Sequence, residues 1–250
     1  MIARKISKRY GGVLALDNVD LTLDKGEIHC LVGENGSGKS TLVRIIAGVV
    51  QPEPAAEIEI DGERIQHLTP LESFRKGIQV VHQDLSLFPN LTIAENIAVT
   101  QYVEKGRSII KWKNIKKVAE EAIGKLGIEL ELDALVGSIP IADQQLVAIC
   151  RALASNAKLL IMDEPTSSLT REEVDRLFSI IRDLQSNGIA TLFISHKLDE
   201  ILEIGQRITV LRDGKKIRTF EKKEVDKQKL IYLITGKEIK YFKHQLQSND

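Results

Sequence analysis

A glycine-rich segment constrains the fold of this chain more than any other feature. The segment, Gly33-Glu34-Asn35-Gly36-Ser37-Gly38-Lys39-Ser40, matches the pattern G-x-x-x-x-G-K-[ST] in full. The apolar run 28–32 before it predicts a buried strand, and the apolar spacing after it predicts a helix from about Lys39 to a stop at Gly48. A strand, such a turn and a helix in succession direct backbone N–H groups at a phosphate. A chance glycine-rich turn is the alternative, and the flanking elements disfavour it.

The residue types in this segment suggest separate roles. The glycines let the backbone fold so that its N–H groups point inward, and the Lys39 ammonium would bridge the β- and γ-phosphates of a nucleotide. The Ser40 hydroxyl would bind Mg²⁺. We therefore expect the nucleotide to be held by the following set: Gly33, Asn35, Gly36, Ser37, Gly38, Lys39, Ser40 and Thr41.

An apolar strand that ends in two carboxylates is a second candidate feature. The apolar run 159–162 leads directly into Asp163 and Glu164, and burial on both faces of a parallel sheet accounts for such a run. Asp163 would emerge at the carboxyl end of the strand and face Mg²⁺. Glu164 would act as general base toward an attacking water. An ordinary strand end is the alternative, which the glycine-rich segment upstream makes less favourable.

Strands and helices alternate along the rest of the chain. This alternation around a phosphate-binding loop predicts an α/β fold with a mostly parallel core sheet, an N-terminal antiparallel β part and a helical insertion over about 84–154. The elements that the patterns predict are strands at 19–23, 28–32, 158–162 and 189–195, hairpins at 58–65 and 208–220, and helices from Lys39, Thr92, Ile115, Thr170 and Lys197.

The composition is that of a soluble globular protein. Among 250 residues, 35 Lys+Arg balance 35 Asp+Glu, which excludes a strongly basic nucleic-acid binder of the histone type. Apolar residues make up 43% and charged residues 28%, so disorder is not expected. No apolar run is long enough to cross a bilayer, and none follows Met1 as in a signal peptide. With only Cys30 and Cys150, we expect reduced thiols and a cytoplasmic protein.

Together these motifs resemble the ATP-binding cassette ATPases, the nucleotide-binding subunits of ABC transporters. The resemblance covers nearly the whole chain and implies a P-loop NTPase fold, ATPase activity, and ATP and Mg²⁺ as cofactors. It implies one cassette over residues 1–240, with 241–250 as a tail or linker. By the same resemblance, Ser40, Gln83 and Asp163 would be the metal ligands.

Three further positions take their roles from this resemblance. Tyr10 stands where the family has an aromatic that stacks on adenine. Gln83 matches the glutamine that contacts Mg²⁺ and the attacking water, and His196 matches the histidine that senses the γ-phosphate. With Glu164, these two complete the expected catalytic set. The alternatives are that Tyr10 is a packing residue, Gln83 a solvated loop residue and His196 a helix cap.

The signature motif departs from the family pattern. The family usually has Leu-Ser-Gly-Gly-Gln here, donated across a dimer interface to the ATP of the other cassette, whereas this chain has Ile139-Pro140-Ile141-Ala142-Asp143. Pro140 supplies neither a hydroxyl nor an N–H, Ala142 adds a methyl group, and Asp143 adds a carboxylate near a phosphate. We expect an intact ATP-binding face and a degraded signature face. The alternative is a rearranged loop that still clamps phosphate.

The branch of the family is indicated by several segments. Gly33 to Gly36, His82 to Leu87, Leu91 to Ile97 and Ile161 to Thr170 are most similar to importers of ribose, galactose and xylose type. The resemblance implies the N-terminal one of two cassettes. Its partners would be a second cassette, transmembrane permease subunits and, indirectly, a substrate-binding protein, on the inner face of the cell membrane and without nucleic acid.

Two other functions remain open at this point. One is a regulatory cassette that binds ATP with little turnover, against which Glu164 and His196 argue. The other is a non-transport ABC protein acting on ribosomes or DNA. Such a protein would need a long coiled coil or a basic arm, and the sequence has neither a sustained heptad repeat nor a block of basic residues.

Overall fold

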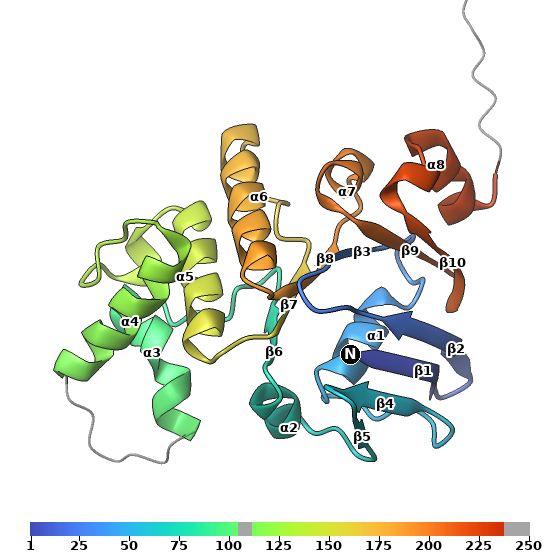
Figure 1. Ribbon diagram of the computed structural model, residues 1–250, viewed down its shortest axis with the longest axis horizontal. Coiled ribbons are helices and arrows are strands. Elements are labelled where there is room, and N and C mark those ends of the chain that lie inside the picture. The colour runs from blue at the N-terminus through green and yellow to red at the C-terminus, as the bar shows by residue number, and fades with distance from the viewer. Residues whose placement is uncertain (105–111, 238–250) are drawn as a thin grey trace, which may run out of the picture.

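A computed structural model describes residues 1–104 and 112–237 of the chain (Figure 1). The strands are β1 Ile2–Tyr10, β2 Val13–Thr22, β3 Ile28–Val32, β4 Glu57–Ile60, β5 Glu63–Ile65, β6 Ile78–Val81, β7 Leu159–Asp163, β8 Ala190–Ile194, β9 Arg207–Arg212 and β10 Lys215–Glu221. The helices are α1 Lys39–Ile46, α2 Pro70–Arg75, α3 Ile93–Glu104, α4 Trp112–Leu126, α5 Ile141–Ala154, α6 Arg171–Ser186, α7 Leu198–Ile204 and α8 Lys227–Thr235, with 3₁₀ turns η1 Val136–Ser138 and η2 Lys222–Glu224.

A six-stranded sheet forms the core, in the order β10-β9-β3-β8-β7-β6. The five strands from β9 to β6 are parallel, and β10 pairs antiparallel with β9. Strands β3 and β8 are buried at every position, which explains why both are apolar apart from His29 and Thr191. The predicted α/β class with a mostly parallel core sheet is confirmed.

A second, antiparallel sheet lies on one face of the core sheet, with helix α1 packed between the two. Its order is β2-β1-β4-β5, and α1 lies between the two sheets (Figure 1). Buried residues of α1 such as Leu42 and Ile46 share one hydrophobic cluster with Ile6 of β1 and Ile194 of β8. The helix that follows the glycine-rich segment is therefore fixed from both sides.

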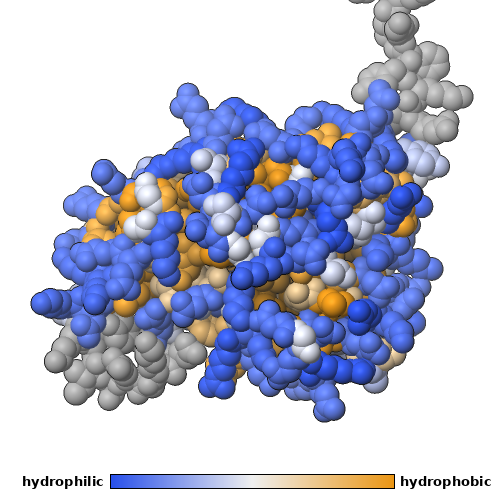
Figure 2. Space-filling model, in the orientation of Figure 1, coloured by the Kyte–Doolittle hydropathy of each residue, from blue (hydrophilic) through white to orange (hydrophobic). Residues whose placement is uncertain are grey.

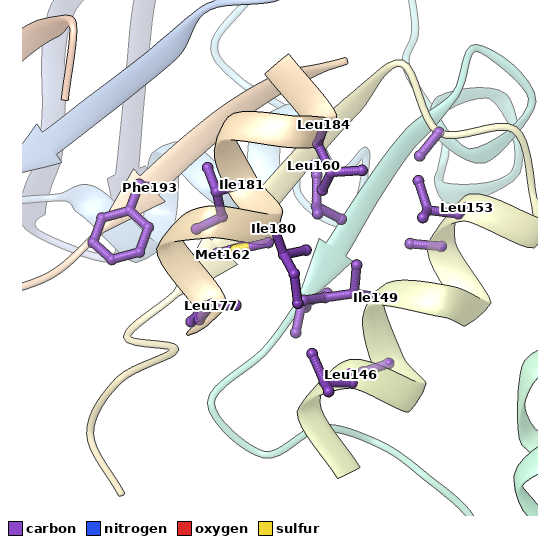
Figure 3. Packing of buried hydrophobic residues seen from close by; sticks show 14 of the residues in the cluster. Leu146, Ile149, Leu153, Leu160, Met162, Leu177, Ile180, Ile181, Leu184 and Phe193 are labelled. Carbon is purple, nitrogen blue, oxygen red and sulfur yellow. The ribbon is translucent and has the colours of Figure 1, made fainter. Parts of the chain in front are cut away.

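The other face of the core sheet is covered by helices. Helix α5 packs against β6 and helix α6 against β8, and Ile149 of α5 lies next to Ile180 of α6 (Figure 3). Phe178 of α6 meets Phe193 of β8 edge to face, with ring centroids 5.8 Å apart. Helices α3, α4 and α5 form a group at one end of the molecule (Figure 1), where hydrophobic residues are visible between hydrophilic ones on the face in view (Figure 2).

Most predicted elements are present. The strands at 28–32, 158–162 and 189–195, the helix from Lys39 and both hairpins are confirmed within a residue or two. The predicted strand 19–23 is only the end of β2, and β1, β6, α2 and α8 were not predicted. In β1 and β2 the pairing register shifts several times, and Lys5 and Asn18 have positive φ, so the alternation of apolar residues is broken. The predicted insertion limits 84–154 and the cassette limits 1–240 remain predictions, and 241–250 lies outside the described residues.

The predicted caps give a testable contribution to stability. Thr170 accepts a hydrogen bond from Glu173 N, and Glu173 accepts one from Thr170 N at 2.7 Å. We expect Thr170→Ala to lower the free energy of unfolding by about 1 kcal/mol, measured by urea denaturation. Ser179→Ala, at an exposed position within the same helix, is the control. Equal midpoints for the two variants would contradict the cap.

Within residues 1–104 and 112–237, no helix combines the length and the apolar character that crossing a membrane requires.

Candidate functional site

The predicted site residues gather at one edge of the core sheet. The glycine-rich segment begins after β3, Asp163 ends β7, and His196 follows β8 by two residues. Because β3, β8 and β7 are adjacent and parallel, their carboxyl ends meet. A ligand at this edge would lie where open parallel sheets usually bind one.

Two glycines are required by the path of the loop. A Cβ on Gly33 would lie 2.3 Å from the carbonyl oxygen of Leu211. At Gly38, which caps α1 with φ of +102°, a Cβ would lie 2.6 Å from Cδ2 of Leu16. Any other residue at either position would displace the loop from β9 or from β2.

The remaining loop residues differ in exposure. Asn35, Gly36 and Ser40 are exposed, and Thr41 is half-buried. Ser37 is 3% exposed, and its Oγ is buried with no hydrogen-bond partner among the described residues. A buried hydroxyl without a partner is costly, and a phosphate oxygen at the loop would satisfy it.

Lys39 lies in the first turn of α1 and folds back on the loop. Its Nζ donates to the carbonyl oxygens of Gly33 at 2.8 Å and Glu34 at 2.9 Å. Burial lowers the pKa of the Lys39 ammonium, while the nearby carboxylates of Glu164 and Asp163 act in the opposite direction. A phosphate would add negative charge here and so favour the ammonium form.

Asp163 lies in a local environment that favours a bound cation. Burial raises the pKa of its carboxyl group, and the neighbouring Glu164 carboxylate raises it further. His82, Lys39 and Arg44 act in the opposite direction. A cation at this carboxylate would offset the cost of keeping two acidic groups adjacent.

Glu164 and His196 contact each other directly. Glu164 Oε1 lies 3.1 Å from His196 Nδ1, and the Glu164 backbone N–H donates to Ile194 O at 2.9 Å. Glu164 has φ of +50°, which is uncommon for a residue other than glycine. Such strain is typical of functional sites, and here it directs a carboxylate from the end of β7 toward the loop after β8.

Gln83 and Tyr10 lie in different surroundings. Gln83 is exposed and lines a small cleft together with His82, Ile141 and Glu164. Gln83 therefore lies on the same side of the site as Glu164. Tyr10 ends β1 in the antiparallel sheet, is 43% exposed and has Lys8 Nζ 5.6 Å from its ring centre. Its stacking role stays a prediction.

The divergent signature segment begins helix α5. Pro140 is the N-cap, and its side chain accepts no hydrogen bond from the first turn, in which Asp143 lies. Asp143 Oδ1 lies 3.7 Å from Nη1 of Arg176 in α6. Ile141 is 43% exposed. The segment therefore presents an apolar side chain at the start of α5 where the family pattern has a serine and glycines.

The oxygen donors suit Mg²⁺. Carboxylate, hydroxyl and amide oxygens are the ligands that this ion prefers, and Asp163, Ser40 and Gln83 supply one of each. Among the described ranges 1–104 and 112–237, no group of three His, Cys, Asp or Glu side chains could hold a metal ion by itself. Any Mg²⁺ here would share its coordination with a ligand, as ions bound with nucleotide phosphates do.

No sequence pattern singles out the residues that hold the site loops together. Thr166, Ser195 and Glu200 are all at most 6% exposed, and both hydroxyls donate to the Glu200 carboxylate. The only signal in the sequence was Glu200 four residues after His196. A glutamate in a first helical turn is usually read as a cap.

The chain matches a known family and its solved structures. The family described as ABC transporter matches residues 16–167. A cassette of an ABC transporter in its ADP conformation has a TM-score of 0.80 at 24% identity, covering 94% of both chains. A dimeric bacterial ABC transporter cassette has a TM-score of 0.75 at 28% identity, covering 88% of this chain and 98% of the other.

Curated relatives are more similar in sequence. Ribose import ATP-binding protein RbsA 1 of Burkholderia ambifaria is 43% identical over 96% of this chain and 47% of its own length. Ribose import ATP-binding protein RbsA 3 of Rubrobacter xylanophilus is 44% identical over 94% and 47%. The chain therefore spans about half the length of the curated relatives it matches.

Proposed function

Because the chain belongs to the ABC transporter family, we propose that it binds and hydrolyses ATP with Mg²⁺ to power a membrane permease. The observation that carries this proposal is the convergence of Lys39, Asp163, Glu164 and His196, with Glu164 and His196 3.1 Å apart. An ammonium, a cation-binding carboxylate, a general base and an imidazole are the groups that phosphoryl transfer to water requires.

Each residue of the site has a defined task in this reaction. Lys39 and the loop N–H groups hold the β- and γ-phosphates, and Ser40, Gln83 and Asp163 would hold Mg²⁺. The ion would neutralise charge on the phosphates. The Glu164 carboxylate accepts the proton of the attacking water, and His196 Nδ1 keeps that carboxylate in place through its contact with Oε1 at 3.1 Å.

The transported class follows from the relatives. Their names include ribose import and, for an Agrobacterium fabrum protein 42% identical over 94% of this chain, ribose/galactose/methyl galactoside import. We assign sugar import to this chain on that ground. Its partners are a second cassette, permease subunits and a substrate-binding protein, and it works on the cytoplasmic face of the membrane.

The start of α5 supports an unequal pair of sites. In a dimer of cassettes, the loop of this chain receives its signature from the partner, and the partner's loop receives residues 139–143. Pro140 has no N–H and no hydroxyl to offer a γ-phosphate, and the Asp143 carboxylate would repel one. One composite site then hydrolyses ATP and the other only holds it. The divergent signature also favours the alternative function, a regulatory cassette. A low rate of ATP hydrolysis in every pairing of cassettes would indicate that function.

The isolated chain is therefore expected to bind Mg-ATP but hydrolyse it slowly, because a homodimer offers only poor signatures. Adding a cassette with an intact Leu-Ser-Gly-Gly-Gln, or combining Pro140→Ser, Ala142→Gly and Asp143→Gln, should raise the rate roughly 10- to 100-fold. The release of inorganic phosphate measures this rate of ATP hydrolysis.

Arg176→Gln is the matched control, because it removes the ion pair with Asp143 and leaves the signature unchanged. A wild-type homodimer as fast as the mixed pair would disprove the asymmetry. No turnover even with the intact partner would disprove the proposed ATPase.

A further inference from the structure

The carboxylate of Glu200 is buried beside the candidate site and has no assigned role. It lies in the first turn of α7 and is 6% exposed. Its Oε2 accepts hydrogen bonds from Thr166 Oγ1 at 2.6 Å and Ser195 Oγ at 3.0 Å. Its Oε1 lies 3.1 Å from Lys197 Nζ. Carboxylates are rarely buried unless they are paired in this way.

The two hydroxyl donors come from the loops that carry the candidate catalytic groups. Thr166 follows Glu164 by two residues, and Ser195 directly precedes His196. Both donors are at most 2% exposed. A carboxylate can only accept, so each hydroxyl proton points at Glu200. One side chain therefore joins the segment after β7 to the segment after β8.

Lys197 completes the same network. Its Nζ donates to the carbonyl oxygen of Thr166 at 2.8 Å, and its backbone N–H donates to Ser195 Oγ at 3.0 Å. The ammonium thus binds the carboxylate and one of the two loops at once. Charge-assisted hydrogen bonds are the stronger ones, and burial strengthens them further.

We propose that Glu200 is a positioning residue for ATP hydrolysis: it fixes the Glu164 loop against the His196 loop. This inference rests on the proposed function. Burial does not fix the contact between Glu164 and His196, because the His196 side chain is 60% exposed, and the bond from the Glu164 backbone N–H to Ile194 O holds only the start of the Glu164 loop. Groups at a reactive site must be held within about 0.5 Å of their productive geometry, and a buried network is the usual means.

The network can be opened on one side at a time. Thr166→Val keeps the size of the side chain and removes the direct hydrogen bond from the Glu164 loop to Glu200, while Ser195→Ala removes the one from the His196 loop. Neither residue belongs to the phosphate-binding loop, so KM and ATP affinity are expected to stay unchanged. We expect kcat to fall about tenfold in either variant, because misplaced groups slow the reaction without weakening binding.

Thr191→Val is the matched control. It makes the same chemical change in β8 at a residue with 0% exposure, and the Thr191 hydroxyl has no hydrogen-bond partner in the described part of the chain. We expect wild-type kcat from it. The double variant Thr166→Val, Ser195→Ala should be no slower than either single variant, because both links pass through one carboxylate.

A second readout does not depend on turnover. Hydrogen exchange of backbone amides should accelerate across the network: at residues 195–198 in Thr166→Val, and at 164–168 in Ser195→Ala. A purely structural role would lower the melting temperature and leave the opposite loop unchanged. Exchange is measured on the nucleotide-free chain, and turnover in the mixed pair with an intact-signature cassette.

The outcomes separate this inference from the function on which it rests. A tenfold loss of kcat with unchanged KM, together with faster exchange in the opposite loop, supports it. An active wild type with Thr166→Val equal to Thr191→Val in kcat and exchange overturns the role of Glu200 alone. A wild-type pair that hydrolyses no ATP overturns the proposed function and the catalytic role of Glu200 with it.

Discussion

Replacing Lys39 by alanine is expected to weaken ATP binding roughly 100-fold, because charge-assisted hydrogen bonds to the phosphates are lost. The fold should survive. Among residues 1–104 and 112–237, the ammonium donates only to the carbonyl oxygens of Gly33 and Glu34, which are half-buried and exposed, so water can replace it there.

Titration of the folded variant with a fluorescent ATP analogue measures the loss, and circular dichroism establishes folding. Lys222→Ala is the matched control, since its Nζ likewise donates to a backbone carbonyl, that of Glu203 at 3.1 Å, but in η2. Equal affinity in a folded Lys39→Ala protein would exclude the loop as the nucleotide site.

Glu164→Gln is expected to reduce hydrolysis by about 10²- to 10⁴-fold while ATP still binds. The amide retains the size of the side chain and a hydrogen bond to His196 Nδ1, but it cannot accept the proton of the attacking water. The closed pair of cassettes should therefore accumulate with ATP bound. Phosphate release by the variant in the mixed pair, and its elution on gel filtration with ATP, measure the two effects.

Glu172→Gln, an exposed position in the first turn of α6, removes one carboxylate near the site loops and should keep the wild-type rate. Normal hydrolysis by Glu164→Gln would remove this residue from the catalytic role. Loss of ATP binding by Glu164→Gln would instead indicate that the charge of Glu164 supports the fold of the phosphate-binding loop.

The parts of the fold that the sequence predicted are those with local causes. The strand β3, the loop and α1 follow one another without interruption, so one pattern specifies all three. The capping box at Thr170 is equally local and was found in the structure. In contrast, the bulges of β1 depend on pairing with β2, and the positive φ of Lys5 leaves no mark on residue type.

The candidate site divides in the same way. Lys39 and Asp163 were predicted because each lies in a pattern with a mechanism. The contact between Asp143 and Arg176, and the burial of Glu200, depend on how α5, α6 and α7 pack. Glutamate in a first helical turn satisfies the N-terminus in most proteins, so its sequence position alone could not distinguish a cap from a link between loops.

The strand order has a consequence for how the chain acquires function. β3 leads into the phosphate-binding loop, yet its sheet neighbours come from the far end of the chain: Cys30 pairs with Phe193 and Ile208. Such distant pairing is slow, because large loops must close before any contact forms. During synthesis the loop leaves the ribosome early and gains both neighbouring strands only once Val210 has emerged to pair with Val32. The chain therefore becomes able to bind nucleotide late in its synthesis, after the helices between β3 and β9 have had time to form.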